Sequence, residues 1–145
     1  MKKILPVICL VGCLYQSCSN QSKDDNMNPF LKPYDTPFAV PPFDKITNND
    51  YIPAFEEGMR QQLDEVNAII SSKKKPTFDN VIVALDRSGQ LLRNVRMVFS
   101  GINSAETSDE MQAIDKEINP KLSQHNDDIF LNMDLFARVK AVYEQ

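Results

Sequence analysis

The sequence predicts an all-α protein of long antiparallel helices behind an extended, proline-rich arm. From Ile52 onward, apolar residues recur at intervals of three and four, which is the period of an amphipathic helix. No segment combines alternating apolar and polar residues with a turn dipeptide, the pattern of a β-hairpin. Five prolines lie between residues 29 and 42, where they exclude both helix and central strand.

We expect four parts in this chain of 145 residues, which has room for one ordinary domain. They are a lipoprotein signal peptide (1–17), a polar tether (18–27), the extended arm (28–46) and an incomplete helical region (47–145). Lys2 and Lys3, followed by a short apolar run, are typical of a secretory signal. That run is shorter than the about 20 residues that span a bilayer. The alternative, a buried core helix, is disfavoured by Pro6.

All three cysteines, Cys9, Cys13 and Cys18, lie in the leader or directly after it, so a disulfide framework in the folded part is excluded. A cysteine after an apolar leader instead indicates lipoprotein processing, in which the thiol is acylated. Cys13 follows the better processing pattern but leaves a very short apolar core. Cys18 gives a normal leader length and follows the small Ser17, so we favour Cys18 and keep Cys13 as the alternative. The predicted location is that of an exported, membrane-anchored lipoprotein at the periplasmic or outer-membrane face.

The arm carries large apolar side chains between its prolines, unlike a purely disordered tether. We expect these side chains to lie in surface grooves of the helical body. The alternative is a mobile tail in which they are incidental. The residues are Phe30, Leu31, Tyr34, Phe38, Val40 and Phe43.

The first helix is expected to begin with Asn48 or Asn49 as its cap, to tolerate Pro53 early and to stop at Pro76. The second is expected to run unbroken from Thr77 to about residue 103. The two should form an antiparallel hairpin through these stripes: Ile52, Phe55, Met59, Leu63, Val66 and Ile70, facing Val81, Leu85, Ser88, Leu92, Val95, Phe99 and Ile102. A glycine inside a helix costs about 1 kcal/mol relative to alanine, so Gly89 indicates close packing by another helix.

A third helix is predicted from a capping box of Thr107 and Glu110, with a kink caused by Pro120. Its stripe is Met111, Ile114, Ile118, Leu122 and Ile129. A fourth helix is expected to start after Asn132. Its sequence stays helix-forming to Gln145, as if a longer element were truncated there.

His125, the one histidine, could be a metal ligand or a general base, or it could be packed against a neighbouring helix. A metal site needs three or four ligands, and the predicted helices offer no second histidine or thiolate. Adjacent carboxylates are better explained by helix starts and solvated faces; they are Glu56-Glu57, Asp109-Glu110 and Asp127-Asp128. We therefore predict no catalytic residue and no metal ligand in this sequence.

The charge pattern excludes nucleic acid as a partner. The chain has a net charge of −4, and its one basic run, Lys73-Lys74-Lys75, is short.

Several segments, in their order and spacing, resemble the N-terminal region of the M3 family of zinc metallopeptidases, in its peptidyl-dipeptidase and oligopeptidase group. They are Asn28-Pro29-Phe30, Val40-Pro41-Pro42-Phe43-Asp44-Lys45-Ile46, Asp50-Tyr51-Ile52-Pro53-Ala54-Phe55-Glu56-Glu57-Gly58-Met59, Pro76-Thr77-Phe78-Asp79-Asn80, Ala84-Leu85-Asp86-Arg87-Ser88-Gly89, Leu135-Phe136-Ala137-Arg138-Val139-Lys140 and the stretch 103–124.

The resemblance implies that these helices form one wall of a deep channel above a zinc ion, which admits short, unstructured peptides. The family's His-Glu-x-x-His motif and further zinc-binding glutamate have no counterpart in this sequence. We therefore expect a channel-wall part of a peptidyl-dipeptidase that lacks the catalytic region and is inactive alone, with zinc belonging to the full-length enzyme. The alternative is a small, lipid-anchored helical lipoprotein that binds a partner and has no enzymatic activity.

Overall fold

The computed structural model describes residues 27–145; the predicted signal peptide, Cys13, Cys18 and nearly all of the tether lie outside this range. The described part contains helices and no β-strand, which confirms the all-α prediction. The α-helices are α1 (Asn48–Ser71), α2 (Ala84–Arg87), α3 (Gln90–Ala105), α4 (Asp109–Phe130) and α5 (Met133–Tyr143). A π-helical segment, Phe78–Val83, leads into α2.

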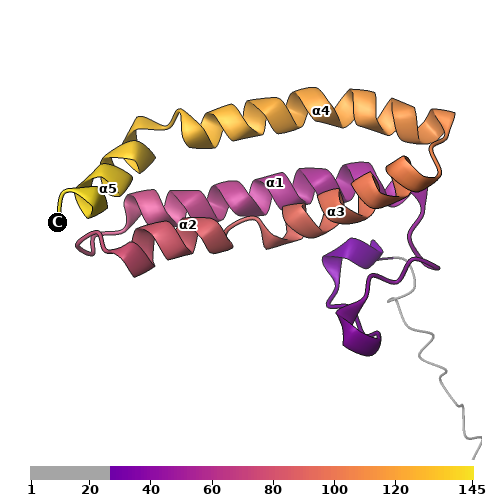
Figure 1. Ribbon diagram of the computed structural model, residues 1–145, viewed down its shortest axis with the longest axis horizontal. Coiled ribbons are helices and arrows are strands. Elements are labelled where there is room, and N and C mark those ends of the chain that lie inside the picture. The colour runs from indigo at the N-terminus through magenta and orange to yellow at the C-terminus, as the bar shows by residue number, and fades with distance from the viewer. Residues whose placement is uncertain (1–26) are drawn as a thin grey trace, which may run out of the picture.

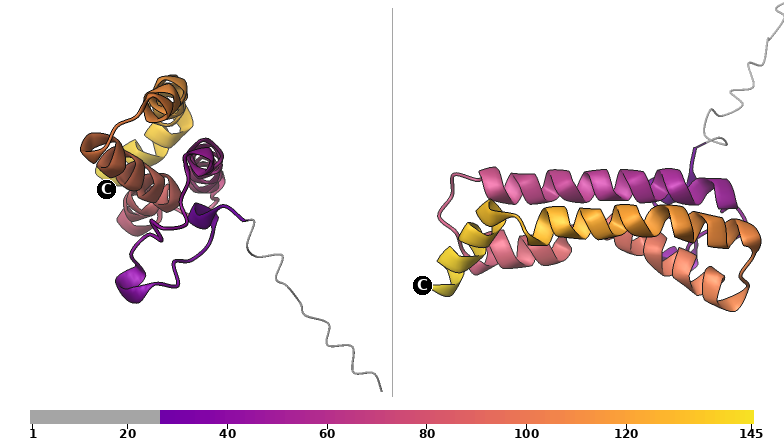
Figure 2. Two further views of the ribbon diagram at one scale, coloured as in Figure 1. Left: turned by 90° about the vertical axis from the view of Figure 1, so that its right-hand side faces the viewer. Right: turned by 90° about the horizontal axis from the view of Figure 1, so that it is seen from above.

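The helices form an elongated up-down-up bundle (Figures 1 and 2). The chain runs along the bundle in α1, returns through α2 and α3, and runs in the first direction again in α4. Helix α5 bends away from the direction of α4 at the end of the bundle and packs against α1 and the π-helical segment (Figure 1). The expected antiparallel hairpin of α1 with the following helical segment is therefore present. Helices α4 and α5 also pack against other elements of the described chain.

The buried side chains form two clusters along the bundle. The larger one joins the arm to α1, α3 and α4, and it centres on three rings, Tyr51, Phe55 and Phe99. The Phe99 ring centroid lies 5.1 Å from that of Tyr51 and 5.6 Å from that of Phe55, in edge-to-face contacts. The smaller cluster joins the end of α1 to the π-helical segment and α5; its buried members are Val66, Ile69, Val81, Ile129 and Leu135.

Helix α1 is capped by Thr47 and not by Asn48 or Asn49. The Asp50 carboxylate accepts from the Thr47 backbone N–H at 2.8 Å and from its hydroxyl at 2.7 Å. Thr47 has an acidic residue, Asp50, three positions after it, as a capping box requires, whereas Asn48 and Asn49 are followed at that distance by Tyr51 and Ile52. Pro53 lies within the helix, as expected.

The prediction of one unbroken second helix was wrong. The chain leaves the helix at Ser88 and Gly89, and Gly89 adopts a left-handed φ of 71° that favours glycine. The Gly89 N–H donates to the Glu65 carboxylate on α1 at 2.7 Å, which compensates for the interrupted helix. The inference of close packing was right, because a Cβ on Gly89 would lie 2.5 Å from the Gln62 side chain.

Helix α4 is capped by Ser108, whose hydroxyl accepts from the Met111 N–H at 3.2 Å, and not by Thr107. The Thr107 hydroxyl instead donates to the Asn103 side chain at 2.8 Å, so it is already engaged. The helix continues through Pro120 as one element (Figure 1). All five residues of the predicted stripe are buried. The predicted start of α5 is also confirmed, because Asn132 caps it.

The arm follows the body of the protein in its first part. Phe30 is buried, its ring centroid lies 5.5 Å from that of Tyr51, and the Asn28 amide donates to the Asp50 carbonyl at 2.7 Å. The prediction fails at four of the six side chains, which are exposed: Leu31, Val40, Phe43 and, at 99%, Phe38. Phe38 and Ala39 both have positive φ values, so the chain turns there and points the Phe38 side chain into solvent.

Candidate functional site

Residues 27–145 contain no group of three or more His, Cys, Asp or Glu side chains that could hold a metal ion. The described residues therefore do not fit a zinc site. The adjacent carboxylates Glu56 and Glu57 form ion pairs instead. Glu57 pairs with Arg60 and Glu56 pairs with Lys121, each at 2.6 Å. Hydrogen bonds from Arg60, and then from Gln61, lower the pKa of Glu57 to about 2, so it stays ionised and is unsuited to proton transfer near neutral pH.

His125 is buried, and its ring bonds to a neighbouring helix. Its Nε2 lies 2.8 Å from Gln62 Oε1 on α1. Burial lowers the pKa of His125, Asp128 opposes that shift and Arg96 adds to it, so the neutral imidazole is favoured. This geometry matches the packed alternative and brings no second ligand to the ring.

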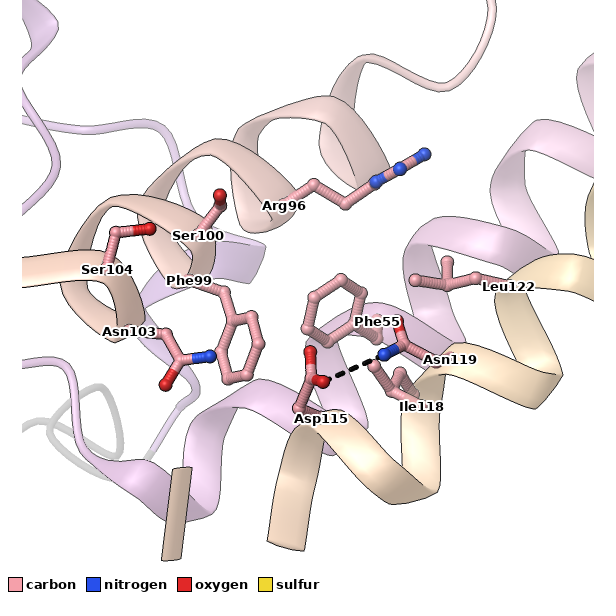
Figure 3. A pocket seen from close by; sticks show the side chains of 10 residues that line it. All are labelled: Phe55, Arg96, Phe99, Ser100, Asn103, Ser104, Asp115, Ile118, Asn119 and Leu122. Carbon is pink, nitrogen blue, oxygen red and sulfur yellow. Dashed lines mark hydrogen bonds between the residues drawn. The ribbon is translucent and has the colours of Figure 1, made fainter. Parts of the chain in front are cut away.

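The described part of the chain has a shallow groove between α3 and α4, of about 190 Å³ (Figure 3). Its apolar floor includes Phe55 and Phe99. Polar side chains from the two helices line the groove around these rings; from α3 they are Arg96, Ser100, Asn103 and Ser104, and from α4 they are Asp115 and Asn119. The Asn119 amide donates to the Asp115 carboxylate at 2.9 Å.

The accessible lining of this groove is mainly amide, hydroxyl and charged groups, which can pair with the alternating backbone donors and acceptors of an extended peptide. Sequence reasoning did not find these residues. On separate amphipathic helices, polar residues such as Asn103 and Asn119 are indistinguishable from a solvated face. Only the structure, which brings them to the same groove, identifies them as candidate contact residues.

Comparisons with known proteins give matches to curated peptidases. The chain is 44% identical over 119 residues to dipeptidyl carboxypeptidase of Escherichia coli and 42% identical over 118 residues to the same enzyme of Salmonella typhimurium. These alignments cover 82% and 81% of this chain. Oligopeptidase A of Escherichia coli is 26% identical over 99 residues. The chain is similar to a segment of peptidases of the M3 family.

The M3 match confirms the resemblance drawn from the sequence, and it concerns a segment of the enzyme. The chain spans 18% and 17% of the length of the two dipeptidyl carboxypeptidases. No family model matches the chain. The relatives give no support to the alternative of a separate helical binding lipoprotein.

None of the helices in residues 27–145 is long and apolar enough to cross a membrane.

Proposed function

We propose that this chain forms a helical wall of the substrate channel in an M3 dipeptidyl carboxypeptidase, which releases dipeptides from the carboxyl ends of short peptides. The observation that carries this proposal is the 44% identity over 119 residues to such an enzyme. The catalytic residues and the zinc ligands would come from the part of the enzyme outside the matched segment. A bound zinc ion would supply Lewis-acid activation of water in that part.

Within this wall, we assign the groove between α3 and α4 to contact with the peptide. Asn103 and Asn119 each carry both a donor and an acceptor, so they can pair with backbone groups of an extended chain. The Phe55 and Phe99 rings lie beneath them in the core, 1% and 5% exposed, so the polar side chains would make most of the contact. Such contacts position a peptide without taking part in the chemistry.

The experiment is a chimera in which this chain replaces the matched segment of the Escherichia coli enzyme. We expect the chimera to release dipeptides, and we expect Asn119→Ala to raise its KM by about two- to tenfold, the value of one hydrogen bond. Gln124→Ala is the matched control. Gln124 is also an exposed amide on α4 and also donates to an aspartate one turn away, at 2.8 Å, but it does not line the groove.

An inactive chimera that is folded would overturn the proposed channel wall. An active chimera whose KM is the same in the Asn119→Ala and Gln124→Ala variants would retain the wall and overturn the assignment of the groove.

We also propose that the protein is exported and anchored by an acylated Cys18. The support for this is the charged and apolar leader and the position of all cysteines in it or directly after it. Stable anchoring at Cys18 would require two or more acyl chains, because a single chain binds membranes only weakly. The peptidase would then act on peptides at the membrane surface.

A further inference from the structure

Helix α5 carries apolar side chains both on its packed face and on its exposed side. Its inner face places Leu135, Val139 and Val142 against the smaller core cluster. Its outer face carries Met133, 74% exposed, and Phe136, 57% exposed. Lys140, seven residues after Met133, lies on the same side of the helix, so the exposed side combines large apolar side chains with one charge.

Residues 27–46 have five exposed large apolar side chains, Met27, Leu31, Phe38, Val40 and Phe43, and within the helical region, residues 48–145, the exposed ones are concentrated near this helix. Between Asn48 and Ile129, the large hydrophobic residues that are exposed are Phe78 and Met97. The following residues add five more within a short stretch: Phe130, Leu131, Met133, Phe136 and Tyr143. We define the corner patch as Phe130, Leu131, Met133 and Phe136, the four that surround the turn between α4 and α5 (Figure 1).

Helix α5 cannot roll to bury the corner patch, because polar contacts fix its orientation. The Arg138 guanidinium donates to the Ser72 and Lys74 carbonyls at 2.9 and 3.0 Å. The Gln145 amide donates to the Pro76 carbonyl at 2.8 Å. These bonds tie α5 to the loop after α1, so the outer face stays outward. Exposed apolar patches of this kind mark interaction sites.

We infer that the corner patch is a docking surface for the part of the peptidase that lies outside the matched segment. This inference rests on the proposed function. More than four-fifths of the length of each dipeptidyl carboxypeptidase lies outside the match, so such an enzyme holds ample chain to cover the patch. The contact would be mainly apolar. Lys140, which forms an ion pair with Glu144 at 3.6 Å, would lie at its edge.

The test uses the same chimera and a matched pair of substitutions, Met133→Ser and Met97→Ser. Both methionines lie on helices and are similarly exposed, at 74% and 70%, but Met97 lies on α3, away from the corner patch. We expect Met133→Ser alone to speed thermal inactivation of the chimera, and its combination with Phe136→Ser to speed it on the order of tenfold, because two side chains then lose a buried environment. Met97→Ser should leave the rate unchanged.

Sedimentation of the 145-residue chain alone provides the second measurement. We expect a monomer whose thermal midpoint is the same with and without the corner-patch substitutions. A dimer that Phe136→Ser dissociates would show that a second copy occupies the patch, and would overturn the inference. Equal inactivation rates for all variants of an active chimera would also overturn it, while leaving the proposed function intact. An inactive unsubstituted chimera would overturn the proposed function, and the inference with it.

Discussion

His125 on α4 and Gln62 on α1 are joined by a hydrogen bond between ring Nε2 and amide Oε1, 2.8 Å apart. The Gln62 amide nitrogen donates in turn to the Ser88 hydroxyl at 3.4 Å, and that hydroxyl donates to the Leu85 carbonyl at 2.7 Å. The direction of these bonds places the His125 proton on Nε2. Its Nδ1 is buried without a hydrogen-bond partner, so protonation there would bury a charged N–H with no acceptor.

This arrangement predicts a loss of stability in mild acid. The pKa of folded His125 lies below the value near 6.5 of the unfolded chain, chiefly because of burial. As the pH falls below about 6.5, the unfolded chain takes up the proton first, so the free energy of unfolding decreases down to the folded-state pKa. Urea unfolding at about pH 7.5 and about pH 5.5 should show a smaller loss for His125→Gln than for the natural chain.

Asp128→Asn provides a control with the opposite sign. The Asp128 carboxylate partly offsets the effect of burial by raising the pKa of His125. Its removal should lower that pKa further and steepen the loss of stability over the same pH range. Identical pH dependence in the natural chain and in His125→Gln would contradict the role assigned to the imidazole.

The 145-residue chain should bind no stoichiometric zinc and should release no dipeptides, because residues 27–145 contain no group that could hold the metal. Metal analysis after dialysis and a peptide assay check this, with the Escherichia coli dipeptidyl carboxypeptidase as the positive control for cleavage. One zinc per chain, or cleavage that a chelator abolishes, would refute it.

Acylation at Cys18 predicts that Cys18→Ser moves the protein from the membrane fraction to the soluble fraction, whereas Cys13→Ser leaves it in the membrane. Mass spectrometry of the extracted protein should find the acyl groups on an N-terminal Cys18. The matched pair separates the two candidate sites. A mature terminus at Cys13, or an intact Met1, would rule out Cys18.

The sequence predicted α1, α4 and α5 to within a residue or two at their starts, because apolar periodicity is a local signal, but the caps of α1 and α4 are the neighbouring residues Thr47 and Ser108. The break at Gly89 could not be predicted because it depends on a contact between residues that are distant in sequence. Locally, glycine within a helix costs only about 1 kcal/mol, and the apolar stripe continues through Ser88. What favours the break is a hydrogen bond from the Gly89 N–H to Glu65, which is distant in sequence.

The groove and the corner patch are properties of packing and could not be predicted in the same way. Asn103 and Asn119 lie on different helices, and only the packing of α3 and α4 on α1 brings them beside Phe55 and Phe99. Phe136 fits a helical apolar pattern as well as Leu135 does. Which of the two is buried depends on how α5 docks.

Gly58 and Gly101 lie in α1 and α3, and substitution by alanine should have opposite effects on stability. A Cβ on Gly58 would lie 2.9 Å from the Cα of Leu92 on α3, so the two helices would have to separate. That overpacking costs about 1–3 kcal/mol and exceeds the gain of about 1 kcal/mol in helix propensity. Gly101 has nothing within 4 Å of the same position, so Gly101→Ala should stabilise by about 0.5–1 kcal/mol. Urea unfolding of both variants measures this, and shifts in the same direction would show that α1 and α3 do not approach this closely.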